Sequence, residues 1–360
     1  MRTATAILTL TGLLLLTVVM GTATDSEAAR ATGFRDRPLE GFGADTPGGS
    51  GGSAYAVTSL ADSGPGTLRD ALSQSNRMVT FSIAGTIELA STIRISGSFI
   101  TIDGTTAPDP GITITAAHAG VSGALLDLKE CHDIVVRNIR ICDAPDTSLG
   151  DNMRIWDDAY NVVIDHCSVR RGGDGALDIS DRANNVTVQW CIIAETVKNS
   201  LIRTDVENLS LHHNLYVGGD ERNPQLDDCL GVDMVNNVIC DWAGNYGSRF
   251  RNGTTVNLVK NYYLASPRSD ESDAVIIDGD VGGVYMSANI IPPACPASGT
   301  TGTRYPAPAV TEMGPTDAME AVLEEAGAWP RDEEDQDYIM STTGSPVQST
   351  SWGFIKSIYR

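Results

Sequence analysis

Three aspartates in the middle of the chain have a spacing that could bind a cation. Asp174 and Asp178 lie in Asp174-Gly-Ala-Leu-Asp178, so in a strand both side chains point to one face of the sheet. Asp151 lies 23 residues before Asp174 (174 − 151), and we expect its carboxylate to meet the other two. Three carboxylates with no Cys or His among them favour a hard cation, calcium rather than zinc. The alternative is a solvated acidic face, which is common in a chain this acidic.

Basic residues are gathered in the same part of the chain. They are Arg154, Arg170, Arg171, Lys198, Arg203 and Arg222. The chain as a whole has a formal net charge of −21 and a pI near 4.5, which argues against nucleic acid as a partner. A polyanionic substrate is compatible with this charge only if such basic residues meet in space. By composition alone, Arg222 is an ordinary loop arginine before the turn signal Asn223-Pro224.

Two histidine positions have both a catalytic and a structural interpretation. Asp165-His166 has the composition of a catalytic pair. The favoured interpretation is a buried histidine that is hydrogen-bonded within its repeat and holds a neighbouring loop. His212 and His213 have the same structural alternative.

A nine-residue unit recurs along the chain and must position all these residues. Copies begin at residues 132, 161, 185, 208, 231, 255 and 283. Positions 2 and 4 of each later copy are apolar, as in Val162 and Ile164, which is the period of a strand with one buried face. A nearly fixed period of this size indicates stacked units, each too small to bury its own apolar face. Leucine-rich and helical repeats fit poorly, because the units have no helical apolar face and are rich in Val, Ile and Thr.

Position 7 of the unit is Asn or Cys in every copy. These residues are Asn138, Cys167, Cys191, Asn214, Asn237, Asn261 and Asn289. The alternation breaks between positions 4 and 7, which predicts a tight bend between two short strands. Asn suits such a bend because it tolerates left-handed backbone angles, and stacked copies should form a ladder of side chains. We therefore predict an all-β fold, a parallel β-solenoid whose coils consist of short strands and bends.

The first residues predict export. Residues 1–24 contain Arg2, an apolar run and then small residues, the pattern of a secretory signal peptide. A membrane anchor is the alternative, but the apolar run is short and one positive charge precedes it. We expect a secreted protein, extracellular or periplasmic, without a membrane partner once the signal is removed. The seven cysteines could then form disulfides. Cys167 and Cys191 should be neighbours, either as a bridge or as a stacked apolar pair, and the other pairings stay open.

The solenoid is expected over residues 33–292, with its first strands in residues 79–103. The Gly-rich stretch Gly41–Gly52 is a loop and lacks the Lys-Ser/Thr of a phosphate-binding loop. Leu68–Asn76 predicts a helix that caps the open end of the solenoid.

The C-terminal part, residues 293–360, is expected to pack on the solenoid and not to form a separate domain. It begins with a Pro-, Ala- and Gly-rich linker over residues 292–314. A helix is predicted over residues 317–328 and an extended tail over residues 329–360.

Five segments, taken in order, resemble the pectate lyases of polysaccharide lyase family 1. They are Val163-Ile-Asp-His-Cys-Ser, Asp174-Gly-Ala-Leu-Asp-Ile, Lys198-Asn-Ser-Leu-Ile, His212-His-Asn-Leu-Tyr and Arg222-Asn-Pro. The stretches VTSLADSGPGTLRDAL, TIDGTTAP and GAWPRDEED also resemble bacterial members, so the likeness covers about residues 33–340. It implies a right-handed parallel β-helix, calcium dependence and cleavage of polygalacturonate by β-elimination.

The resemblance also implies roles for single residues. Asp151, Asp174 and Asp178 match the calcium-binding acids of the family. Arg222 matches the arginine that takes the proton from C5 of the uronate, and Lys198 matches the lysine that contacts the substrate carboxylate. Arginine is an awkward base because its ordinary pKa is about 12.5 or more, so this mechanism predicts a rate that rises into alkaline pH.

The chain departs from the family pattern at one position near the site. The family usually has a second arginine five residues after the first, and here that position is Asp227. The lost positive charge leaves open a partly methylated or different uronan as substrate. Arg203 stands where many relatives have glycine and could compensate. Asp165 and His166 match an aspartate-histidine motif that is structural in the family.

Three functions remain open at this point. The first is a secreted, calcium-dependent lyase acting on an acidic polysaccharide, expected to be a monomer. The second is a glycoside hydrolase of the polygalacturonase type on the same solenoid, using aspartates as acid and base. The third is a non-catalytic carbohydrate-binding solenoid.

Overall fold

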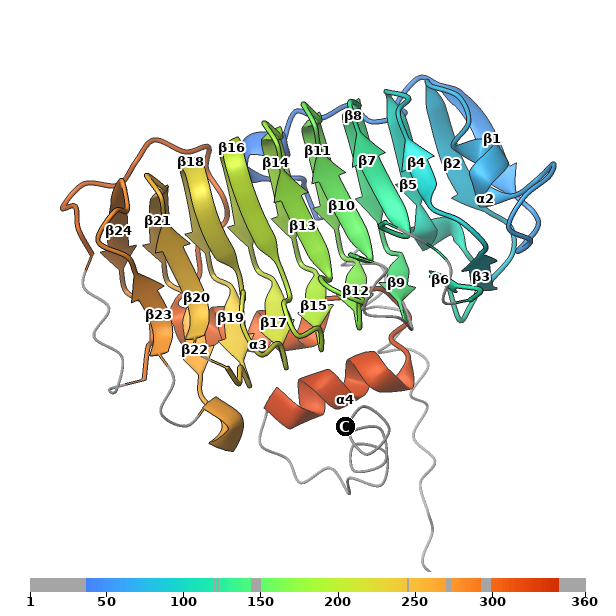
Figure 1. The fold of residues 1–360 in the computed structure, drawn as a ribbon. Coiled ribbons are helices and arrows are strands. Elements are labelled where there is room, and N and C mark those ends of the chain that lie inside the picture. The colour runs from blue at the N-terminus through green and yellow to red at the C-terminus, as the bar shows by residue number, and fades with distance from the viewer. Residues whose placement is uncertain are drawn as a thin grey trace, which may run out of the picture. The chain divides into compact units, whose positions relative to one another are not determined.

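The computed structural model describes residues 37–118, 121, 123–143, 150–244, 246–269, 273–292 and 299–342. The expected signal peptide, Cys295 and the last eighteen residues of the expected tail lie outside these ranges. The described chain forms a parallel β-helix, as the nine-residue unit predicts: successive coils stack in register and build long ladders of parallel strands (Figure 1). No helix in the described ranges is long and apolar enough to cross a membrane.

Three faces run along the stack. Face A contains β4 (Ile93–Ile95), β7 (Leu126–Lys129), β10 (Met153–Trp156), β13 (Leu177–Ser180), the first halves of β16 (Leu201–His212) and β18 (Gln225–Val235), β20 (Tyr246–Arg251) and β23 (Asp273–Ile277). Face B contains β1 (Ser53–Val57), β2 (Arg77–Phe81), β5 (Ile100–Asp103), β8 (His132–Arg137), β11 (Tyr160–Asp165), β14 (Asn184–Gln189), the second halves of β16 and β18, β21 (Thr255–Val259) and β24 (Gly283–Ser287). Face C contains β3 (Gly85–Leu89), β6 (Ile112–Ala116), β9 (Arg140–Cys142), β12 (Ser168–Arg170), β15 (Ile192–Ala194), β17 (Leu215–Val217), β19 (Val238–Cys240) and β22 (Tyr262–Leu264).

The repeating unit explains how each coil turns from face B to face C. Positions 2 and 4 point inward and are buried, as in Val162 and Ile164, and they form one continuous apolar core with their equivalents in other coils. The bend follows, and its left-handed residue is position 6, for example His166 (φ 49°) and Trp190 (φ 53°). We expected the Asn at position 7 to adopt this conformation, which is wrong for the four copies from residue 208 onward that have Asn there. Position 6 is His, Trp, Asn, Lys or Ala in the copies from residue 161 onward, so the left-handed conformation is set by the bend and not by one residue type.

The asparagine side chains at position 7 form hydrogen bonds between successive coils. Asn214 Nδ2 donates to Asn237 Oδ1 at 3.0 Å, Asn237 Nδ2 to Asn261 Oδ1 at 3.0 Å, and Asn261 Nδ2 to Asn289 Oδ1 at 3.1 Å. The predicted ladder is therefore confirmed. Each amide also binds backbone groups inside the bend, so these buried polar atoms are satisfied.

Cysteines replace asparagine in the two coils before this ladder. Cys167 and Cys191 are buried, and the Cys191 thiol accepts a hydrogen bond from the Cys167 N–H at 3.4 Å. All six cysteines in the described ranges are free thiols. Of the two alternatives for Cys167 and Cys191, the structure has the stacked pair and not the bridge.

The N-terminal end differs from the sequence prediction in two elements. Strand β1 comes directly after the Gly-rich stretch and was not predicted. The capping helix α2 covers only Leu68–Ala71 and not all of Leu68–Asn76; the Thr67 side chain caps it by accepting the Asp70 N–H at 3.2 Å. The Gly-rich loop lies against face B, where Gly43 N–H donates to Thr187 Oγ1 at 2.9 Å.

Two helices at the C-terminal end lie against face C (Figure 1). Helix α3 covers Pro315–Glu325, close to the predicted 317–328. Helix α4, Glu333–Thr342, falls in the region expected to be an extended tail, so that expectation is wrong here. Acidic residues in the first turn favour this helix, and the buried Asp335 is held by Arg170 of β12.

Candidate active site

The residues implied in chemistry come together at the edge of face A. Asp151 precedes β10, Asp178 lies in β13, Lys198 precedes β16 and Arg222 precedes β18. Parallel bridges align Gly175 with Lys198 and Lys198 with Glu221, so the segments before these strands also stack in register. Figure 1 shows these strands side by side in the middle of the molecule. The coil register thus brings residues from four coils to one place.

Asp151 and Asp178 approach each other across Gly175. A Cβ atom built on Gly175 would lie 2.3 Å from Asp151 Oδ1 and 3.1 Å from Asp178 Oδ1. Asp178 Oδ1 accepts the Leu201 N–H at 2.7 Å, whereas the buried Asp151 Oδ1 has no hydrogen-bond partner in the described part of the chain. Gly175 was not singled out from the sequence, although a glycine between two site acids is a usable sign of a close approach.

These carboxylates are electrostatically unfavourable as they stand. Burial and the neighbouring Asp174 raise the pKa of Asp151 to about 6, although Arg154, Arg222 and Arg203 act against this shift. Burial and the charge of Asp151 raise the pKa of Asp178 well above its ordinary value, against the Leu201 N–H and Arg222. A positive charge placed between the two carboxylates would favour their ionised forms.

The third acid lies beside the pair but has another partner. Asp174 Oδ1 accepts a hydrogen bond from Lys198 Nζ at 2.9 Å, and its side chain is half exposed. No group of three or more His, Cys, Asp or Glu in the described ranges is arranged to hold a metal ion. Asp151 and Asp178 nevertheless fit a hard cation, because one buried oxygen is unpartnered and both carboxylates face one gap. Asp174 would have to leave Lys198 to join them.

Arg222 is held in position by its backbone. Its φ is 64°, and the Asn223–Pro224 peptide bond that follows is cis. The buried Asn223 accepts a hydrogen bond from Asn199 Nδ2 at 2.7 Å, which fixes this turn to the preceding coil. Arg222 Nε has no hydrogen bond in the described chain and lies 3.8 Å from Glu221 Oε1. The charge of Arg222 acts on Asp151 and Asp178, and its side chain also interacts with Tyr246.

Asp165 and His166 lie elsewhere, on face B, in a network that gives both oxygens of Asp165 a donor. Asp165 Oδ1 is 2.6 Å from His166 Nδ1, and Arg137 Nη2 donates to Asp165 Oδ2 at 2.7 Å. Gln189 Nε2 donates to Asp165 Oδ1 at 2.9 Å, and Gln189 Oε1 accepts the Glu40 N–H at 3.0 Å. The network holds the N-terminal loop, as the structural interpretation predicts. His212 and His213 are also fully buried, with their Nδ1 atoms 3.0 Å apart.

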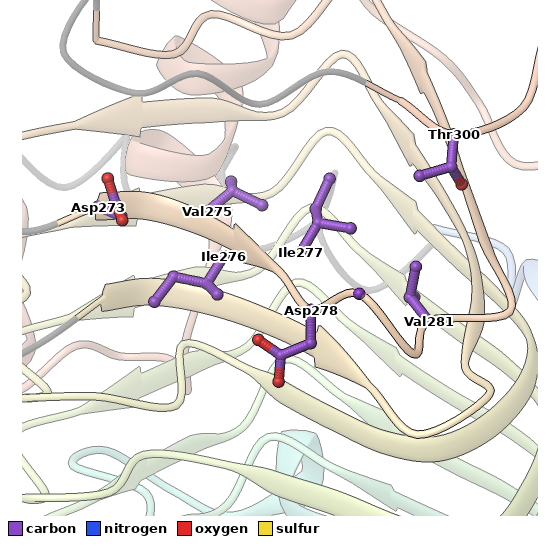
Figure 2. A pocket seen from close by; sticks show the side chains of 8 residues that line it. Asp273, Val275, Ile276, Ile277, Asp278, Val281 and Thr300 are labelled. Carbon is purple, nitrogen blue, oxygen red and sulfur yellow. The ribbon is translucent and has the colours of Figure 1, made fainter.

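Two pockets lie along the strands of the later coils. One, of about 460 Å³, is formed by β23 and the residues after it, including Asp273, Asp278 and Thr300 (Figure 2). Asp278 is paired with Arg249 Nη2 at 2.8 Å, and much of the lining is aliphatic. The other, of about 470 Å³, is lined by Arg203, Thr204, Asp227, Asp228 and Asn252. The second contains two charged residues that were singled out from the sequence, Arg203 and Asp227.

Comparison with known proteins gives relatives of one kind. No family model matches the chain. It is 38% identical over 237 residues to a protein named probable pectate lyase C from Aspergillus flavus, covering 63% of this chain and 54% of that protein. A pectate trisaccharide-lyase from a Thermotoga species is 28% identical over 164 residues, covering 41% of this chain and 43% of that protein. The resemblance to the pectate lyases is confirmed. The chain spans about half the length of the curated relatives it matches.

Solved structures of pectate lyases share the fold. A pectate lyase from a Bacillus species in complex with trigalacturonate has a TM-score of 0.58 at 18% identity, covering 81% of this chain and 98% of that one. Pectate lyase C from Erwinia chrysanthemi, solved with Ca²⁺, has a TM-score of 0.53 at 19% identity, covering 81% and 96%. The cedar pollen allergen Jun a 1 has a TM-score of 0.66 at 19% identity, covering 81% and 92%. At these identities the structures support the fold alone, which is the predicted parallel β-helix.

Proposed function

We propose that the protein is a secreted pectate lyase that cleaves polygalacturonate by β-elimination. The observation that carries this proposal is the unfavourable acid pair Asp151–Asp178 beside Lys198 and Arg222 on one face of the β-helix. The relatives named pectate lyases and the structures solved with Ca²⁺ or trigalacturonate support it. We further propose that Asp151, Asp174 and Asp178 hold a calcium ion.

The chemistry requires removal of a weakly acidic proton from C5 of a uronate. A calcium ion bound by the three aspartates would neutralise the adjacent substrate carboxylate and so make this proton more acidic. In our proposal Lys198 leaves Asp174 and binds the same carboxylate, which adds a second positive charge where negative charge develops.

Arg222 then acts as the base. It takes the C5 proton, the C5–H electron pair forms the C4–C5 double bond, and the bond from C4 to the glycosidic oxygen breaks. The departing oxygen leaves with the electron pair of that bond and takes a proton from water. The products are a shortened chain and an oligogalacturonate with a 4,5-unsaturated end. For this step Arg222 must be a neutral guanidine, and the hydroxide that water leaves behind then removes the proton from Arg222 and restores the base. Arg222 Nε makes no hydrogen bond in the described chain, which supports this role.

One observation favours a hydrolase as the second candidate. A buried carboxyl group whose pKa is raised to about 6, as for Asp151, is what a general acid of a glycosidase needs. One absorbance measurement separates the two functions, because elimination leaves a conjugated double bond that absorbs in the ultraviolet and hydrolysis does not.

The test is an absorbance assay on polygalacturonate and on pectin, with calcium or with a chelator. We expect ultraviolet absorbance to rise only with calcium, and the rate to climb into alkaline pH. Reducing ends released without absorbance, or a rate optimum near pH 5, would overturn the lyase proposal. Calorimetry on Asp178→Ala, with and without an oligogalacturonate, tests the metal ligands; unchanged calcium binding in both conditions would remove Asp178 from the site.

A further inference from the structure

Arg203 is an exposed cation on the strand next to the candidate site. It lies in β16, where its Cα is in register with Ser180 of β13 and with Asp227 of β18. The neighbouring outward residue of β16 is Leu201, whose N–H binds Asp178 Oδ1 at 2.7 Å. Two residues along a strand span about 6.6 Å, so the Cα of Arg203 lies about this distance along β16 from Leu201, the residue that binds Asp178.

Arg203 forms no direct pair with an acid in the described part of the protein. Its side chain has no ion pair and no hydrogen bond among the described residues. It lines the 470 Å³ pocket, and its charge is felt by Asp151, whose ionised form it favours. An arginine between a pocket and an acid pair, without a partner of its own, can receive an anionic group from a ligand.

The acid across the pocket is already neutralised. Asp227 Oδ2 lies 3.4 Å from Arg251 Nε, and Asp227 Oδ1 accepts a hydrogen bond from Asn252 Nδ2. The other pocket acid, Asp228, is an exposed residue of β18 with a φ of 64°. Asp227 therefore opposes an incoming anion less than its formal charge implies, and Arg203 is the cation left available.

We propose that Arg203 binds the free carboxylate of a galacturonate residue in this pocket, next to the residue held at the acid pair. The inference rests on the proposed function and deepens it: the pocket selects an unesterified sugar. A planar guanidinium can bind a carboxylate with two parallel hydrogen bonds, and a methyl ester removes both the charge and this pairing. Arg203 of β16 thus supplies the positive charge that the family usually has at the position of Asp227.

The experiment compares wild type with Arg203→Ala and Arg203→Lys on polygalacturonate and on highly methyl-esterified pectin. For Arg203→Ala we expect KM on polygalacturonate to rise roughly tenfold or more, the loss typical of one hydrogen-bonded charge pair, with kcat within about twofold. On esterified pectin KM should change by less than about threefold, because the ester makes no ion pair. Arg203→Lys should keep part of the affinity, since it keeps the charge without the fork.

Lys260→Ala is the matched control. It removes one positive charge from the bend after β21, where Lys260 pairs with Glu312 at 2.9 Å. Its KM should equal that of wild type on both polymers. Melting temperatures check that each variant folds, and Arg203→Gln replaces Arg203→Ala if the latter does not. Equal KM values for Arg203→Ala and Lys260→Ala, or an equal loss on both polymers, would overturn the inference.

Calorimetry separates this inference from the proposed function. Trigalacturonate is titrated into wild type and Arg203→Ala in the presence of calcium, without any turnover assay. If wild type shows no lyase activity but binds the trisaccharide roughly tenfold more tightly than Arg203→Ala, the lyase proposal fails and the carboxylate site stands. If wild type is active and both proteins bind the trisaccharide equally, the lyase proposal stands and the carboxylate site at Arg203 is excluded.

Discussion

Two sets of buried aspartates in this molecule have opposite electrostatic states. On face B, burial opposes the charge of Asp165, but His166, Arg137 and Gln189 outweigh it and lower its pKa to about 2. On face A, burial and the charge of Asp174 raise the pKa of Asp151 to about 6, and burial and the charge of Asp151 raise the pKa of Asp178. Both sets are built on the same coils, a few residues from each other along the chain.

The difference distinguishes a carboxylate used for folding from one kept for a ligand. Each oxygen of Asp165 has a donor within the protein, so its charge stabilises the fold. Asp151 Oδ1 is buried and unpartnered within the described chain, so its charge destabilises the fold until something positive arrives. The two sets therefore differ in whether the carboxylate oxygens have donors, and not in the number of acids.

The largest effect is expected on activity, for Arg222→Lys. A positioned base contributes about 10²–10⁴-fold, so kcat on polygalacturonate should fall by that range in the absorbance assay. Lysine keeps the charge but not the planar group. The loss of stability should be small by comparison, because lysine keeps the positive charge and Arg222 Nε makes no hydrogen bond in the described chain. Wild-type turnover in this variant would exclude Arg222 as the base.

Asp165→Asn should give the largest effect on stability. Removing one charge from a buried, hydrogen-bonded pair costs about 3–5 kcal/mol, to be measured by urea unfolding. The depressed pKa means that the stabilisation is present above about pH 4 and is lost as the pH falls towards 2. Asp158→Asn is the control: Asp158 is exposed and pairs with Arg182, so its loss should cost far less than that of Asp165. Equal costs would contradict the comparison.

In the presence of a chelator, Asp151→Asn should stabilise the fold, whereas Asp165→Asn destabilises it. Because the pKa of Asp151 is raised to about 6, the unfolded state releases its proton first, and the wild-type fold loses stability as the pH rises from 4 to 6. Above pH 6 the variant should be more stable than wild type by on the order of 2–3 kcal/mol. With calcium the order should reverse, because the variant loses a ligand. A less stable variant in chelator would show that Asp151 has a hidden partner.

Gly175→Ala should give the smallest effect, a fall in calcium affinity with little change in stability. Its Cβ would lie 2.3 Å from Asp151 Oδ1, so the two carboxylates must move apart, and calcium affinity should fall roughly tenfold in calorimetry. The contacts are with side-chain ends, which can shift at little cost in stability. Gly279→Ala is the control, since no atom lies within 4 Å of its Cβ position. The same calcium affinity in both variants would mean that the gap across Gly175 is not part of the site.

Much of the fold could be predicted from the sequence because the unit repeats. Alternation at positions 2 and 4 identifies the strands of face B, and the nearly constant spacing gives their register. The repeat predicts nothing outside itself, which is why β1 and α4 were missed. Helix α4 depends on a contact between distant segments, Asp335 with Arg170, that no local pattern reveals.

The sequence could predict which residues lie near the candidate site, but not which of them bind one another. The spacing of Asp174 and Asp178 and the coil register predicted acids on one face. Which acid pairs with Lys198 depends on the reach of a flexible side chain, so the Asp174–Lys198 contact could not be foreseen. The roles of Arg222 and Lys198 came from the resemblance, because a single arginine or lysine in a loop carries no periodic signal.

The asparagine ladder has a direction. From Asn214 through Asn237 and Asn261 to Asn289, each side-chain amide donates a hydrogen bond to the next one, always in the same direction. The amide dipoles therefore add along the axis and polarise one another, so the stack has a head and a tail even where its coils look alike. A coil grafted onto the Asn289 end would extend this chain only if it offered an acceptor at position 7. Thus an engineered extension should place asparagine there, and not a residue that only donates.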